Sequence, residues 1–161
     1  MVALANPIEN PCFGCGPAHR RGLHLSFERL VADDGTDELR TSYTPQPDEV
    51  GWPGVFHTGL HFTVLYEVSY WAALTLGGHL MVSDGPVTYA RERLPRVGQR
   101  HTARATVTAR SAERLTIVAT DQSESGKPCG RLESEWVYVH RSTIERSGLS
   151  LPPYLLDELI D

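Results

Sequence analysis

Residues 51–78 read GWPGVFHTGLHFTVLYEVSYWAALTLGG, and the rest of the fold is arranged around this stretch. Its opening glycines and proline mark a turn, and no proline follows between Thr58 and Leu76. The apolar residues of that run do not alternate with polar ones, and its length suits a helix rather than a strand. They point in nearly every direction around the helix, which is typical of a helix buried on all sides. Gly77-Gly78 predicts the helix end.

Glu67 stands out because it is a carboxylate in a helix that is otherwise predicted to be buried. Burying an unpaired carboxylate is costly, so such a group is normally bonded or used for chemistry. Two interpretations stay open. Glu67 is either a functional acid or a structural one, bonded to a neighbouring strand or a partner subunit. His61, earlier on the same helix, is predicted to be a core or interface residue.

Length and composition indicate a single globular domain that works in the cytoplasm. The 161 residues can bury one core, and 40% apolar and 22% charged residues are ordinary values. A net charge of −5 argues against nucleic acid or an anionic membrane as partner. His61 and Glu67 interrupt the longest apolar run, which argues against a membrane span. No secretory signal is visible, and three cysteines fit a reducing compartment better than a disulfide framework.

Residues 1–21 are rich in Pro, Gly and Cys and are predicted to form an irregular arm. The arm contains CFGCG at 12–16, and His19 and His24 extend this to C-x2-C-x3-H-x4-H. Such a spacing could hold zinc, but the loops between the ligands would be shorter than in known structural sites. Ordinary packed thiols are therefore favoured. A redox cysteine pair is a further alternative, although no βαβ unit follows it.

Strand-like segments flank the helix on both sides. Leu23–Ala32 and Glu38–Tyr43 surround Asp33-Asp34-Gly35, which is a hairpin signal. Four more strands are predicted after the helix, in meander order, and the third of them is apolar enough to be central. They are Val87–Leu94, His101–Ala109, Arg114–Thr120 and Arg131–His140.

One long helix with about six strands predicts an α+β domain, in which the helix packs against one curved antiparallel sheet. We place this domain at residues 22–142. The tail, residues 143–161, is predicted to contain a short amphipathic helix that starts at Pro152-Pro153.

The order of elements resembles the hotdog fold, in which a sheet wraps around one central helix. Four landmarks resemble the acyl-CoA thioesterase branch of that superfamily, of the phenylacetate-pathway type. They are CFGCG followed by GLHLSF at 22–27, GWPGVFHTG at 51–59, the helix that carries Glu67, and RLPRVG at 93–98. The resemblance implies hydrolysis of acyl-CoA by a homodimer or tetramer with its sites at the subunit interface. It implies no cofactor, because CoA is part of the substrate.

In that branch the helix opens with His-Gly-Gly, and an acid nine positions beyond the His is nucleophile or general base. His57 and Gly59 match this motif, whereas Thr58 replaces its first glycine and Tyr66 occupies the position of the acid. Glu67 follows directly. The resemblance therefore implies either that Glu67 has taken over as base or nucleophile, or that the protein is a catalytically silent binder of acyl-CoA or a scaffold. A dehydratase on the same fold would need an Asp soon after His57, and none follows.

Ten residues of helix separate His57 from Glu67 by ~15 Å along the axis, so the two cannot act on one atom within one chain. A joint site needs two copies. The N–H groups of Thr58, Gly59 and Leu60 at the helix start are the expected oxyanion donors. His57 would orient the thioester or its water, or would only bond to the helix backbone.

The remaining candidates are side chains that could contact the substrate. Thr63, Tyr66, Tyr70 and Trp71 could contact the acyl group, or could simply pack. Arg91 and Arg93 share one face of a predicted strand and could bind CoA phosphates, although a solvated charged face is the simpler interpretation. Burial beside Trp71 is expected to raise the pKa of Glu67.

Overall fold

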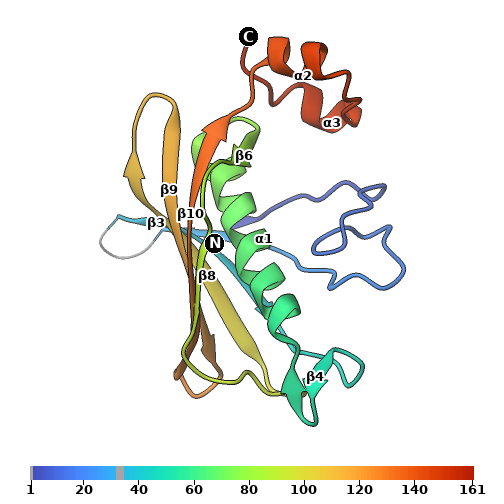
Figure 1. Ribbon diagram of the computed structural model, residues 1–161, viewed down its shortest axis with the longest axis vertical. Coiled ribbons are helices and arrows are strands. Elements are labelled where there is room, and N and C mark those ends of the chain that lie inside the picture. Colours follow the sequence, from blue (N-terminus) through green and yellow to red (C-terminus); the bar gives the residue numbers. More distant parts are fainter. Residues whose placement is uncertain (1, 32–34) are drawn as a thin grey trace.

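A computed structural model of the protein describes residues 2–31 and 35–161 (Figure 1). Its central element is helix α1 (Thr58–Gly77), as the sequence predicts. His57 is the N-cap. Gly78 ends the helix in the left-handed conformation at φ 85°, and its N–H bonds to the carbonyl oxygen of Leu74. Glycine adopts this conformation without the steric cost that a Cβ atom brings, which explains the clean end.

An antiparallel sheet packs against one side of α1 (Figure 1). Its strand order is β1-β2-β3-β8-β9-β10-β6, and β7 also pairs with β10. The strands are β1 (Val2–Ala3), β2 (Glu28–Val31), β3 (Asp37–Tyr43), β6 (Met81–Ser83), β7 (Thr88–Arg91), β8 (His101–Arg110), β9 (Arg114–Ser123) and β10 (Pro128–Tyr138). A small separate hairpin, β4 (Val50–Trp52) with β5 (Val55–Phe56), precedes α1, and the chain ends with α2 (Arg141–Ser147) and α3 (Pro153–Leu156).

The predicted α+β class and the central place of β9 are confirmed, but the meander after the helix is wrong. Strand β7 lies beside β10 rather than beside β8. Strand β6 pairs with the far end of the same strand, so β6 and β7 lie end to end along β10. The outer edge of an 11-residue strand offers more unpaired N–H and C=O groups than one short strand can bond.

The predicted strand Leu23–Ala32 is shorter in the structure, where β2 begins at Glu28. Residues before it bond to the arm instead of the sheet: the N–H of Leu23 bonds to the carbonyl of Phe13, and that of Leu25 to the carbonyl of Gly14. His24 between them has φ 49°. The predicted turn residues Asp33 and Asp34 lie outside the described residues.

The core lies between α1 and the sheet. Val64, Leu65, Val68 and Ala72 of the helix are fully buried. They meet small and branched residues of the central strands, namely Ala103, Ala105, Leu115, Ile117, Ala119 and Leu132. Alanines on the sheet allow the helix to approach closely, because their side chains end at Cβ.

The opposite side of α1 is covered by the arm and the C-terminal tail rather than by a sheet. In Figure 1 the arm (blue) loops out on the side of α1 away from the strands, and α2 and α3 lie beyond one end of the helix. Leu80, Val139 and Leu159 form a second small core beneath the tail. No helix within the described residues is long and apolar enough to cross a membrane.

Candidate active site

Glu67 projects from the middle of α1 into the folded arm. Its Oε1 atom lies 3.3 Å from the Sγ atom of Cys12, which is a hydrogen-bonding distance for sulfur. Its Oε2 atom is buried, and no hydrogen-bond partner for it occurs within the described residues. A Cβ atom on Gly14 would lie 2.3 Å from Cγ of Glu67, so only glycine allows the arm to pack this closely against the carboxylate.

The CFGCG segment forms a tight loop that holds both cysteines against α1. The N–H of Gly16 bonds to the carbonyl of Cys12 at 2.8 Å, and the N–H of Cys12 bonds to Oδ1 of Asn10 at 3.0 Å. A Cβ atom on Gly16 would lie 2.3 Å from the carbonyl oxygen of Asn10. Nδ2 of Asn10 also approaches the Sγ atom of Cys15 at 3.7 Å. The conformation of the loop is therefore fixed by its glycines and Asn10.

The acid and the two thiols shift one another's proton affinities. Hydrogen bonding from Cys15, together with the backbone N–H groups of Cys15 and Gly14, lowers the pKa of Cys12 to about 5. The hydrogen bond to Cys12, together with burial, raises the pKa of Cys15 far above its usual range. Burial, followed by the nearby charge of Cys12, raises the pKa of Glu67 to about 7. These opposite shifts favour the Cys12 thiolate, with the shared proton on Glu67.

A cavity of about 360 Å³, which we call the arm cavity, lies beside this group. Its wall includes Cys12 and Cys15 from the arm and the side chains of Tyr70, Trp71 and Leu74 from α1. The C-terminal tail closes another side with Leu155. Of the predicted substrate contacts, Tyr70 and Trp71 thus lie at one cavity. Glu67 itself does not line it, because Cys12 stands at the wall beside the acid.

A second cavity, of about 290 Å³, lies at the start of α1, and we call it the helix-start cavity. It brings together three predicted site residues, His57, Thr58 and Arg91. Nη1 of Arg91 donates to Oγ1 of Thr58 at 2.8 Å. Nδ1 of His57 accepts the N–H of Gly59 at 3.1 Å, so this histidine bonds to the helix backbone and caps the helix. Arg93 is exposed and does not line this cavity.

The other predicted contacts lie apart from both cavities. Oγ1 of Thr63 bonds to the carbonyl of Gly59 in its own helix at 2.9 Å. Leu60 packs against the core. Tyr66, at the position where the acid is usual, stacks on Phe62 and shares a hydrogen bond of 2.7 Å with Ser83. These three side chains are accounted for by local structure.

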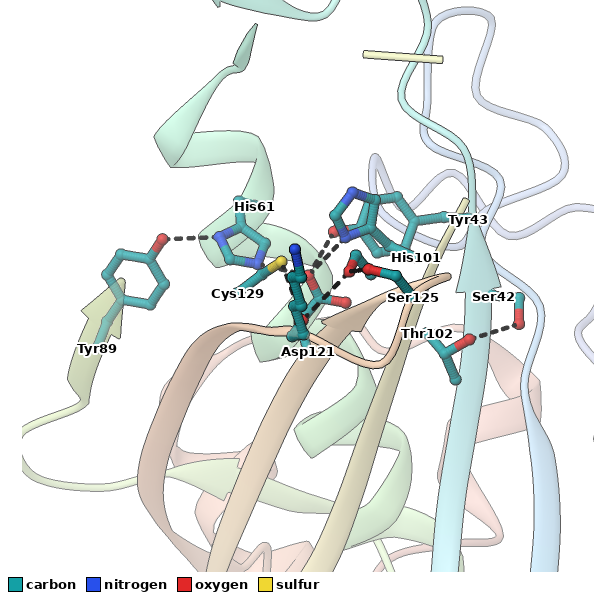
Figure 2. Close-up of polar contacts among 11 residues, drawn as sticks. Ser42, Tyr43, His61, Tyr89, His101, Thr102, Asp121, Ser125 and Cys129 are labelled. Carbon is teal, nitrogen blue, oxygen red and sulfur yellow. Dashed lines mark hydrogen bonds and ion pairs between the residues drawn. The ribbon is translucent and has the colours of Figure 1, made fainter. Parts of the chain in front are cut away.

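His61 is fully buried, as expected, and belongs to a polar network around Asp121 that the sequence alone does not predict (Figure 2). Nε2 of His61 and Nδ1 of His101 lie 3.1 and 3.0 Å from Oδ2 of Asp121. An ionised carboxylate only accepts hydrogen bonds, so each of these ring nitrogens carries a proton. Nδ1 of His61 lies 2.8 Å from the hydroxyl of Tyr89.

Burial alone would raise the pKa of Asp121, but the hydrogen bonds from His101 and His61 outweigh it and lower that pKa. The sequence holds a signal for this buried acid. Leu115, Ile117 and Ala119 point inward from β9, and a period of two places Asp121 on the same face.

Two groups of donor atoms in the described part of the chain lie within 4.8 Å of one another, as metal binding requires: Cys12, Cys15 and Glu67, and His101, Asp121 and Cys129. Neither group includes His19 or His24, so the four-residue zinc spacing does not assemble. Nδ1 of His19 instead accepts the N–H of Arg21. In the first group Cys12 is hydrogen-bonded to Glu67, and in the second His101 is hydrogen-bonded to Asp121, while Sγ of Cys129 donates to the carbonyl of Lys127.

No family model and no curated protein matches the sequence. Solved structures do match the fold. A thioesterase superfamily protein is 20% identical, with a TM-score of 0.66 over 76% of this chain, which spans 60% of that protein's length. The E. coli PaaI protein from the phenylacetic acid degradation operon is 14% identical, with a TM-score of 0.59 over 69% of this chain and 82% of its own.

A hypothetical thioesterase from Streptococcus pneumoniae, solved with coenzyme A, is 12% identical, with a TM-score of 0.60 over 69% of this chain and 86% of its own. At such identities the likeness concerns architecture: one long helix against an antiparallel sheet. The predicted fold is confirmed, and the chain has the hotdog fold of these thioesterase superfamily proteins.

Proposed function

We propose that the protein hydrolyses acyl-CoA thioesters at a site shared between two copies of the chain. One observation carries the proposal: Glu67 is a half-buried carboxylate with a buried, unpartnered oxygen within the described residues and a pKa raised to about 7. A general base works best when its pKa lies near the working pH. The fold supports the substrate class, because one structure with the same fold was solved with coenzyme A.

In this proposal the start of α1 from the facing copy stabilises the developing oxyanion. The first N–H groups of a helix have no acceptor within it, and they lie at the positive end of the helix dipole. His57 occupies the N–H of Gly59. The amides of Thr58 and Leu60 are therefore the donors we assign to the thioester oxygen, and His57 holds the turn that aims them.

The two cavities would receive the two ends of the substrate. Arg91 at the helix-start cavity supplies a cation for the CoA phosphates, and its bond to Thr58 holds it beside the helix start. Tyr70, Trp71 and Leu74 give the arm cavity an apolar wall that suits an acyl or aryl chain. A dimer brings the helix-start cavity of one copy to the arm cavity of the other.

A catalytically silent binder of acyl-CoA is the competing function, and Tyr66 is the observation that favours it. Its hydroxyl is bonded to Ser83, so it cannot replace the acid that the fold's thioesterases are expected to carry at this position. Hydrolysis then depends on Glu67, one helix position away. Binding without turnover would identify the silent protein.

The test is release of CoA thiol from acetyl-, hexanoyl- and phenylacetyl-CoA by the wild type and by Glu67→Gln. We expect Glu67→Gln to lose about 100-fold in rate, the usual contribution of a positioned general base. Glu145→Gln, an exposed change on α2, is the matched control and should retain wild-type rates. Equal rates in wild type and Glu67→Gln would remove Glu67 from the mechanism. Binding of all three compounds without CoA release would instead establish the silent binder.

A further inference from the structure

The CFGCG loop has no role in the function proposed above, yet it places a thiol between Glu67 and the arm cavity. Cys12 lines the cavity, whereas Glu67 does not. A substrate acyl group in the arm cavity would therefore meet the Sγ atom of Cys12 before the carboxylate. Helix α1 contributes only apolar and aromatic side chains to the cavity wall. The sulfur of Cys12 therefore lies as a reactive atom at a cavity that suits an acyl chain.

The surroundings of Cys12 are those of an activated nucleophile. A nucleophile needs an acid–base partner within hydrogen-bond reach, and Oε1 of Glu67 lies 3.3 Å from Sγ. A thiolate is stabilised by nearby donors, and the backbone N–H groups of Cys15 and Gly14 help to lower the pKa of the Cys12 thiol. Oε2 of Glu67 is buried and has no hydrogen-bond partner in the described part of the chain, so the carboxylate keeps an acceptor that the folded structure does not use.

Cys15 is not an equivalent candidate, although it also borders the cavity. Cys15 is only 3% exposed, and Nδ2 of Asn10 lies 3.7 Å from its sulfur. Its pKa is raised by the hydrogen bond to Cys12, so it stays a thiol and serves as a donor to the Cys12 sulfur. The two cysteines therefore divide into a nucleophile and a supporting donor.

We infer that Cys12 is the nucleophile of the reaction and accepts the acyl group from acyl-CoA before water does. In the first step the Cys12 thiolate attacks the thioester carbonyl and a new C–S bond forms. The bond from carbonyl carbon to CoA sulfur breaks, and the CoA thiolate takes the proton from Glu67. The product is S-acyl-Cys12 and free CoA, an exchange of one thioester for another.

In the second step the Glu67 carboxylate takes a proton from water, which attacks the carbonyl carbon of S-acyl-Cys12. The bond from that carbon to Sγ breaks, the acid leaves, and the Cys12 thiolate returns with the proton on Glu67. Atoms and charges balance without an oxidant or metal. The inference rests on the proposed function, and it gives Glu67 two roles, as acid in the first step and base in the second.

The experiment is to mix the protein with acetyl-CoA or phenylacetyl-CoA, quench with acid and locate acyl groups by peptide mass spectrometry. We expect an acyl group on Cys12 that hydroxylamine removes, with more of it in Glu67→Gln. CoA can leave as a thiolate without the acid of the first step, whereas water in the second step lacks its base. Cys12→Ser should lose the adduct and about 100-fold in hydrolysis rate. Cys129→Ser, a buried cysteine outside the arm, is the control and should keep both.

The outcomes separate this inference from the function on which it rests. If Cys12→Ser unfolds like the wild type and hydrolyses acyl-CoA at the wild-type rate, Cys12 is not the nucleophile, while thioester hydrolysis stands. The role of Cys12 as nucleophile is also excluded if the wild type hydrolyses acyl-CoA but neither it nor any variant carries an acyl group on Cys12. A third outcome is release of a single equivalent of CoA, with an acyl group on Cys12 and no further turnover. It would support Cys12 as the nucleophile and would exclude hydrolysis as the function. Neither adduct nor CoA release overturns both.

Discussion

The sulfur of Cys12 lies 3.3 Å from Oε1 of Glu67, although 55 positions separate the two residues in the chain. This contact joins the arm to the central helix of the hotdog domain. The carboxylate of Glu67 points away from the sheet. The contact places it beside a thiol of lowered pKa and next to the arm cavity. The arm is therefore part of the candidate site and not an appendage to it.

The first prediction concerns the pH dependence of hydrolysis. Glu67 must be ionised to take a proton from water, and its pKa is raised to about 7. The rate of the step in which water attacks should therefore rise with pH and reach half of its plateau near that value. An ordinary glutamate would give a midpoint near about 4.3. Steady-state rates at constant ionic strength measure the profile, and a flat profile from pH 5 to 8 would contradict this role.

The second prediction concerns the reactivity of Cys12 toward iodoacetamide. With a pKa lowered to about 5, Cys12 is ionised at pH 6, where an ordinary cysteine, with a pKa of about 8.5, is not. Cys12 should be alkylated at a rate that hardly changes from pH 8 down to pH 6. Peptide mass spectrometry identifies the labelled residue. Cys15→Ala removes the main hydrogen bond that lowers this pKa, so the midpoint should move upward; an unchanged midpoint would reject the assigned cause.

The third prediction concerns Gly14, which allows the arm to pack on Glu67. Gly14→Ala would place a Cβ atom 2.3 Å from Cγ of Glu67, so the loop must move and the free energy of unfolding should fall by about 1–3 kcal/mol. Denaturant unfolding measures the loss. In a Glu67→Ala background the clashing atom is absent, and the same change should cost clearly less. Equal costs in both backgrounds would show that the strain lies elsewhere.

The fourth prediction concerns Arg91 at the helix-start cavity. If its guanidinium binds a CoA phosphate, Arg91→Ala should raise KM about tenfold and leave kcat nearly unchanged, since a hydrogen bond to a charged group is worth about 1.5 kcal/mol. Arg93 does not line this cavity and serves as the comparison. A larger rise of KM in Arg93→Ala than in Arg91→Ala would contradict the assignment.

The fifth prediction concerns stability and the buried network of Asp121. Asp121→Asn removes a buried carboxylate that accepts from His61 and His101, and should cost about 3–5 kcal/mol in free energy of unfolding. Asp84→Asn, in a half-exposed pair with Arg114, should cost about 1 kcal/mol or less. Equal losses in the two variants would contradict the structural role of Asp121.

The pH dependence of this stabilisation has a definite sign. Because the pKa of Asp121 is lowered in the folded state, its contribution is complete above the unfolded value of about 3.9. The contribution is lost as the pH falls through the folded-state pKa. Asp121→Asn should therefore lose less of its stability on acidification than the wild type does.

The central helix, its ends and the α+β class follow from the amino-acid sequence without further information. Local rules decide these features, because Thr58–Gly77 lacks proline, is mostly apolar and is followed by a glycine in the left-handed conformation. The long strands β8, β9 and β10 are likewise predicted, as strand-like runs separated by turn-forming residues. The unusual carboxylate at Glu67 can also be singled out, because one charged residue in an apolar helix is a local anomaly.

What Glu67 touches and how the sheet is ordered depend on the assembled three-dimensional structure. The partner of Glu67 is Cys12, 55 positions away in the chain, and no local sequence pattern predicts a contact over that separation. The placement of β6 and β7 along β10 depends on which edge of the sheet lacks hydrogen-bond partners, which is a property of the complete sheet. The reason is the same in both cases: spacing along the chain fixes which side a residue faces, but packing alone fixes what it faces.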